Sequence, residues 1–173
     1  MQTNRLKFLL LMIGLFVLGI CLMQYTVFAY WNENITQKEK ATEEVILNED
    51  EIDAFELVNK YRMENSLPKL KFSKQLQEVA RIKANDIVES EYFSHDSLTY
   101  GKTFNIMKDK GIYYDVAGEN LAGNISSEKA VEAWINSKTH RENMLDKDYN
   151  YTALCVVESP IYGKVFVQLF MKI

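Results

Sequence analysis

The first thirty residues carry the longest apolar pattern of the chain. Sixteen residues without a polar side chain run from Phe8 to Met23, and with two polar interruptions the stretch reaches Tyr30. The residues before it include Arg5 and Lys7 and no acid. An apolar stretch of roughly 20 residues is long enough to cross a bilayer as a helix. The pattern therefore predicts an N-terminal hydrophobic helix over residues 1–31.

This segment has two alternative fates. A secretory signal peptide has a shorter apolar region, of about 7–15 residues, and a cleavage site with small residues; residues 27–29 (VFA) could serve as that site. The longer run, with Tyr30 and Trp31 at its end, favours an uncleaved single-pass anchor in the cell membrane. Secretion after cleavage near Ala29 is the alternative. Because the basic start stays in the cytoplasm, we expect the rest of the chain outside the cell, with residues 32–47 as a polar tether.

From residue 48 onward, five segments show apolar residues at helical spacing or helix start signals. Asn48 and Glu51 form a capping-box pattern at the first, and Thr139 and Glu142 form another at the last. The sequence predicts five helices. They run from Asn48 to just before Pro68, from Ser73 to just after Val88, from Thr103 to Gly111, from Ser126 to just after Ile135, and from Thr139 to Leu145.

The spacing of apolar residues changes near the end of the chain. Residues 149–157 are rich in β-forming side chains, residues 159–163 provide a turn, and residues 164–170 alternate between apolar and polar. This pattern predicts a C-terminal antiparallel hairpin. Residues 118–123, which read GENLAG, are expected to form a further strand. Helices followed by paired strands predict an α+β domain over residues 48–173, with helices packed on a small sheet.

Composition narrows the function classes. Residues 1–30 hold two basic and no acidic side chains, so residues 31–173 carry 18 basic against 24 acidic side chains, a net charge of −6. With no basic cluster in the sequence, nucleic-acid binding is not expected. Cys155 is the one cysteine after the apolar segment, which excludes an intramolecular disulfide there, and we expect it to be buried. No P-loop, dinucleotide fingerprint, CxxC or HExxH motif is present.

Four motifs after the tether resemble, in order, those of the CAP superfamily, the SCP-like extracellular domains. They are FSHDS around His95, GENLA around Glu119, AVEAWINSKTHRENML around His140, and VFVQLF near the end. Each motif alone is weak, but together with two upstream matches, VNxxR at residues 58–62 and LPxLxF at residues 67–72, the ordered set covers about residues 50–172. The pattern WxxSxxHR is similar to that of the bacterial branch.

The resemblance implies a three-layer α-β-α sandwich with a shallow groove lined by histidines and acids. His95 and Glu119 carry over to the groove. His140 belongs to the bacterial helix motif, so its place in the same groove is an inference. Ser137 stands where the eukaryotic branch has a second glutamate, and it lies three residues before His140. A Ser137–His140 pair without an orienting acid is a weak candidate for a catalytic triad.

Three functions stay open at this point. The first is an extracytoplasmic binding or signalling module whose groove takes a peptide, glycan, lipid or metal ion. The second is a peptidase-like hydrolase using His95 and Glu119; with His140 they could form a His₂Glu zinc site that leaves one position open for water. The third is a structural ectodomain without a ligand. A shared fold does not decide among them.

Overall fold

The computed structural model describes residues 23–33 and 45–173, and the chain divides into two compact units, residues 1–45 and 46–173. The described part of the first unit is a helix over residues 23–33. Within the described ranges no helix is long and apolar enough to cross a membrane. Most of the predicted anchor and tether, at residues 1–22 and 34–44, lies outside the described residues.

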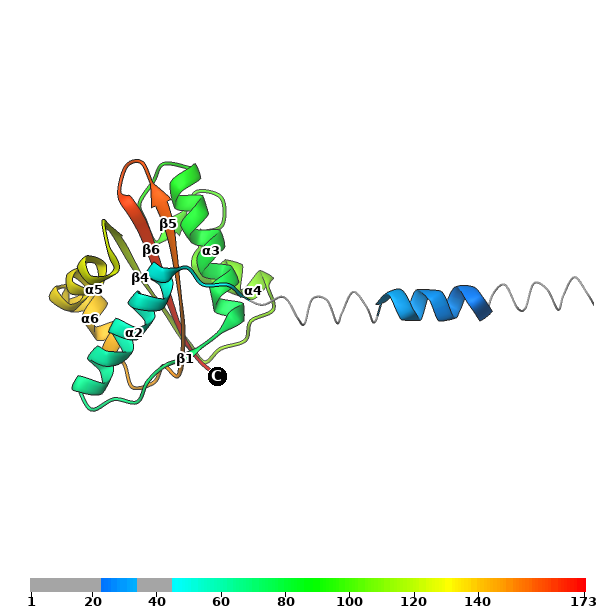
Figure 1. Cartoon of the computed structure of the whole chain (residues 1–173), viewed down its shortest axis with the longest axis horizontal. Helices are drawn as coiled ribbons and strands as arrows, with labels where there is room; N and C mark the ends of the chain where they lie inside the picture. Colours follow the sequence, from blue (N-terminus) through cyan, green and yellow to red (C-terminus); the bar gives the residue numbers. More distant parts are fainter. Residues whose placement is uncertain (1–22, 34–44) are drawn as a thin grey trace, which may run out of the picture. The chain divides into compact units, whose positions relative to one another are not determined.

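A four-stranded sheet forms the middle of the second unit (Figure 1). Its strands are β1 (Lys71–Phe72), β4 (Val116–Asn124), β5 (Tyr151–Ser159) and β6 (Gly163–Lys172), in the order β1-β5-β6-β4. β5 and β6 form the predicted antiparallel hairpin, in which Ser159 pairs with Gly163. GENLAG lies within β4, as predicted, and β4 is the edge strand beside β6.

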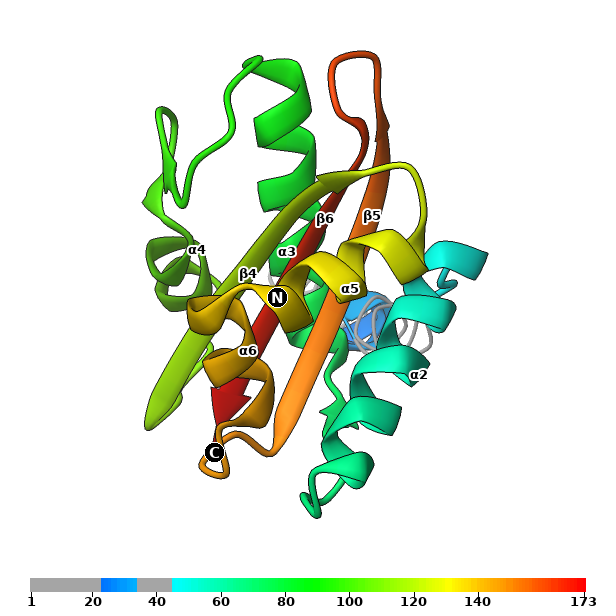
Figure 2. The same cartoon turned by 90° about the vertical axis from the view of Figure 1, so that its left-hand side faces the viewer.

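Helices cover both faces of this sheet (Figure 2). On one face, α3 (Lys74–Glu89) and α4 (Thr103–Asp109) close an apolar core with the odd-numbered residues of β6. On the other face, α2 (Glu49–Glu64), α5 (Ser127–Asn136) and α6 (Lys138–Leu145) pack on Phe166 and Phe170. Side chains alternate between the two faces along a strand. The α+β class and the three-layer α-β-α arrangement are therefore confirmed.

The helix ends test the capping predictions. Asn48 and Glu51 form both bonds of a capping box, and Ser73 and Ser126 each accept a bond from a backbone N–H of the first turn. The capping box predicted at Thr139 is wrong, because α6 already begins at Lys138, with Ser137 as the one residue between it and α5. The two helices thus share a junction that leaves no room for a separate capped start.

The sequence did not indicate three short strands. β1, β2 (Asp96–Ser97) and β3 (Gly101–Lys102) have two residues each, too few to show a period of two. β2 and β3 pair with each other and hold together the loop that carries His95. The smallest elements therefore shape the part of the domain that bears the candidate site.

Candidate functional site

Glu119 is presented by the edge strand on the face covered by α3 and α4. Its neighbour Leu121 packs in the core of that face, while Asn120 points to the opposite one. The Glu119 residue is only 7% exposed. The glycine before it is needed because a Cβ at Gly118 would collide with the Tyr149 hydroxyl.

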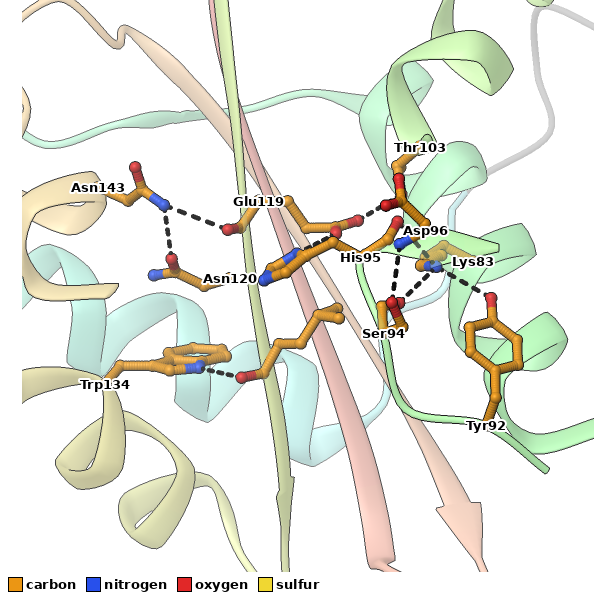
Figure 3. Close-up of polar contacts among 11 residues, drawn as sticks. Lys83, Tyr92, Ser94, His95, Asp96, Thr103, Glu119, Asn120, Trp134 and Asn143 are labelled. Atoms are coloured by element: carbon orange, nitrogen blue, oxygen red, sulfur yellow. Dashed lines mark hydrogen bonds and ion pairs between the residues drawn. The ribbon is translucent and has the colours of Figure 1, made fainter. Parts of the chain in front are cut away.

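Both carboxylate oxygens of Glu119 have partners (Figure 3). Oε1 lies 2.6 Å from Nδ1 of His95, and Oε2 accepts a bond of 2.5 Å from the hydroxyl of the buried Thr103. Thr103 is the first residue of α4, so β4, the His95 loop and α4 meet at one carboxylate. From the sequence, Thr103 was recognised only as a helix start.

The imidazole of His95 is fixed on one side and open on the other. The hydrogen bond to Glu119 raises the pKa of His95 above its ordinary value, against the opposing effect of partial burial, and the negative charge of Glu119 adds to the increase. The side chain is 59% exposed. Because Nδ1 is occupied by Glu119, Nε2 is the nitrogen available to a ligand or a proton.

The free edge of β4 is covered by side chains from α5 and α6. Nδ2 of Asn143 donates to the Glu119 carbonyl at 3.2 Å and to Oδ1 of Asn120 at 2.9 Å, and Nε1 of Trp134 donates to the Leu121 carbonyl at 3.0 Å. Carbonyls two residues apart on an edge strand point to the same side. These bonds fix the strand beneath the site and also block part of an exposed sheet edge. Trp134 is buried, as predicted.

A groove of about 380 Å³ lies between α4 and α6 along this edge. Its lining includes His95, Glu119, Lys102, Phe104 and Asn143. Neither Asn143 nor Lys102 was singled out from the sequence. Asn143 falls inside the motif around His140 and could have been noticed as a polar residue one helical turn farther on.

His140 and Ser137 are not among the lining residues of this groove. The backbone carbonyl of His140 accepts a bond of 3.0 Å from Nδ2 of Asn120. Burial lowers the pKa of His140, and so does the nearby charge of His95. Ser137 is the residue between α5 and α6, and His140 lies within α6. The groove roles of His140 and Ser137 stay predictions.

The donor set can be compared with the predicted His₂Glu metal site. Among the described residues, no group of three or more His, Cys, Asp or Glu side chains is arranged to hold a metal ion. Glu119 in particular has both oxygens in hydrogen bonds. Glu119 does not fit as a direct ligand. It does fit the role of the carboxylate that commonly accepts a hydrogen bond from the second ring nitrogen of a metal-binding histidine.

Cys155 is the one cysteine of residues 46–173. It is buried and free, and burial raises the pKa of its thiol, which confirms the expectation of an inert small apolar residue. Its position in β5 faces α3, outside the groove.

Comparison with known proteins places this geometry in a family. Residues 55–170 match the CAP family, described as the Cysteine-rich secretory protein family. Two Bacillus subtilis (strain 168) proteins are similar over about two thirds of the chain: YkwD, 39% identical over 67% of this chain and 44% of its own length, and the membrane protein YlbC, 34% identical over 68% and 33%. The chain thus spans less than half the length of these relatives.

Solved structures agree in fold. An extracellular SCP-domain protein from Bacillus anthracis str. Ames superposes with a TM-score of 0.66 at 30% identity, covering 72% of this chain and 40% of that one. An outer surface protein from Borrelia burgdorferi has a TM-score of 0.68 at 23% identity, with 74% and 96% covered, and shows the fold alone. From Phe55 to Phe170, the chain belongs to the CAP family of SCP-like domains.

Proposed function

We propose that this protein is an extracytoplasmic binding module, held near the membrane by its N-terminal segment, whose groove binds a ligand through His95. A relative described as extracellular and another described as a membrane protein support the location. The apolar run over residues 8–23 supports the tether.

The observation that carries the proposal is the contact of 2.6 Å between His95 and Glu119. A buried carboxylate on Nδ1 fixes the tautomer and the orientation of the ring, so that Nε2 faces the groove ready to bind. An exposed histidine without a function has no need of a buried acid that is itself held by a threonine and by the strand edge.

The ligand class that suits this arrangement is a divalent cation, or a small polar ligand that donates to Nε2. For a cation such as zinc, His95 would be one ligand, with Glu119 behind it, and His140 would be the second. Burial lowers the pKa of His140 and so favours the neutral ring, the form in which imidazole binds metal. Zinc bound there would supply a Lewis acid to the groove.

Calorimetric titration of the full chain with zinc tests this. We expect binding by the wild type, loss of binding in His95→Ala, and about tenfold to hundredfold weaker binding in Glu119→Gln, the effect of removing a supporting carboxylate. Glu78→Gln is the matched control, because Glu78 is an exposed acid of α3 that pairs with Lys110 and lies outside the groove. Equal zinc affinity in the wild type and in His95→Ala would contradict the proposal.

A hydrolase is the second candidate, because an imidazole oriented by a carboxylate can act as a general base toward water. The hydroxyl of Thr103 donates to Glu119 and not to His95, so it is not a nucleophile paired with this imidazole. Turnover of a peptide substrate that disappears in His95→Ala and persists in Glu78→Gln would establish this function. Without such turnover, the binding module stands.

The tether is tested in cells. Protease added to intact cells should release residues 46–173 and leave the first thirty residues with the membrane fraction. A mature chain beginning at Tyr30 in the medium would instead show cleavage after Ala29, and the secreted form would replace the anchored one.

A further inference from the structure

Lys83 occupies a place where a charge is unexpected. It lies four residues after Val79 and four before Ile87, in the stripe of α3 that packs on the sheet, and it is completely buried. Burying an ammonium group costs several kcal/mol unless its hydrogen bonds are replaced. An apolar residue would suit the stripe, so the charge needs another reason.

The hydrogen bonds of Lys83 all lead to the loop that carries His95. Its Nζ donates to the Tyr92 hydroxyl at 2.9 Å, to the Ser94 carbonyl at 2.8 Å and to the His95 carbonyl at 3.2 Å (Figure 3). An ammonium group has three donors, and all three are used. Two consecutive carbonyls, one of them that of His95 itself, are thus tied to one buried atom.

A second anchor lies one helical turn farther along α3. The Tyr92 hydroxyl, which accepts from Lys83, donates to the carboxylate of Asp86. Asp86 is buried, and its pKa is lowered by hydrogen bonds from Ser97, Tyr92 and Thr99 against the opposing effect of burial. The loop is therefore held by α3 on both sides of His95, at residues 92–95 and again at residues 97–99.

No salt bridge ties Lys83 to an acid among the residues that the structure describes, and its contacts are neutral oxygens. Burial lowers the pKa of Lys83, and the carboxylates of Glu119, Asp86 and Asp96 partly restore it. The ammonium group of Lys83 is therefore influenced by the negative charge of Glu119 and also donates a hydrogen bond to the backbone of His95.

We infer that Lys83 is a positioning residue of the groove: its buried ammonium fixes the Ser94 and His95 backbone so that the imidazole meets Glu119. The inference rests on the proposed function for its relevance to ligand binding. Its geometric part, the dependence of the His95–Glu119 bond on Lys83, stands independently of any ligand.

The test replaces Lys83 with methionine, which keeps most of the side-chain volume and removes the charge and the donors. In the full chain, NMR follows the His95 Nδ1 proton that bonds to Glu119, and calorimetry follows zinc. We expect Lys83→Met to keep the core spectrum, to lose the hydrogen-bonded Nδ1 signal, and to bind zinc about tenfold to hundredfold more weakly. Tyr92→Phe removes one of the three acceptors and should show the same changes to a smaller degree.

Lys164→Met is the matched control. Lys164 is a lysine whose ammonium group is also held by a partner, with Nζ 2.6 Å from Oδ2 of Asp50, but it lies outside the groove. It should leave the Nδ1 signal and zinc binding unchanged. A folded Lys83→Met protein with the wild-type Nδ1 signal would overturn the inference; if that variant does not fold, an unchanged signal in Tyr92→Phe would do so. If the wild type itself binds no zinc, the proposed cation site fails, while the Nδ1 signal still decides the role of Lys83.

Discussion

The two histidines of the domain are close enough to affect each other, yet their surroundings differ. His95 lies in an exposed loop, but its ring is bonded to a buried acid and its backbone to a buried lysine. His140 lies on α6, is less exposed, and contributes its backbone carbonyl to the bond with Asn120. The pKa of His95 is raised and that of His140 is lowered.

The difference lies in the polar groups that hold each residue and not in the burial of the ring. The polar groups that hold His95 come from α3 and β4, and α4 in turn holds Glu119. The groups around His140 hold the strand edge and not its imidazole. We therefore expect His95 to dominate binding, with His140 contributing a neutral second nitrogen.

The largest loss of stability is expected from a substitution in the core on the side of the domain that carries His140. Trp134 is 1% exposed and its indole donates to the Leu121 carbonyl. Trp134→Ala should lower the free energy of unfolding by about 3–5 kcal/mol, the range for large aromatic side chains in cores. Denaturant melts of residues 46–173 measure this loss, and a change below about 1 kcal/mol would mean that the indole is not part of the core.

A smaller loss is expected at the strand edge between the two histidines. Asn143→Ala removes the donor to the Glu119 carbonyl and to Oδ1 of Asn120. An unsatisfied buried polar group costs about 1–3 kcal/mol. The same melts test this, with Asn105→Ala as control, because Asn105 is an exposed residue of α4 that bonds only locally. Equal stability of the two variants would show that Asn143 does not hold the edge.

The two histidines should respond to pH in opposite directions. Because the pKa of His95 is raised on folding, its stabilising contribution is present below its ordinary pKa and is lost as the pH rises through the folded value. For His140, whose pKa is lowered, stability is lost as the pH falls. His95→Ala should thus cost more at pH 5.5 than at pH 8.5, and His140→Ala less. Unfolding curves at the two pH values that shift alike for both variants would contradict this comparison.

The smallest effect is expected at Ser137. Its side chain makes no capping bond at the junction of α5 and α6. Ser137→Ala should therefore change the free energy of unfolding by less than about 0.5 kcal/mol and leave zinc binding unchanged. A clear loss of zinc affinity would bring Ser137 into the groove, as predicted from the sequence.

The layers of the fold could be predicted because their signals are local. Capping residues such as Asn48 and Ser73, and the alternation near the end of the chain, fix helices and strands over short windows. The ordered motifs then indicated the sandwich. The capping box at Thr139 failed because a neighbouring helix end decided where α6 begins, which a local pattern does not show.

The candidate site could be predicted only in part. His95 and Glu119 stood in recognisable motifs, but their partners Thr103 and Lys83 come from other elements and have ordinary sequence surroundings. A lysine inside an apolar helical stripe was the one visible signal for Lys83. Direct ligation by Glu119 could not be judged from the sequence, because it depends on which groups occupy its two oxygens.

The central claim is that Glu119 prepares His95, and not His140, for binding. NMR titration of both imidazoles in the wild type and in Glu119→Gln tests it most directly. We predict that His95 titrates above the ordinary value for histidine and His140 below it, and that Glu119→Gln lowers the pKa of His95 while changing that of His140 little. A His95 that titrates at its ordinary value and does not respond to Glu119→Gln would contradict the account.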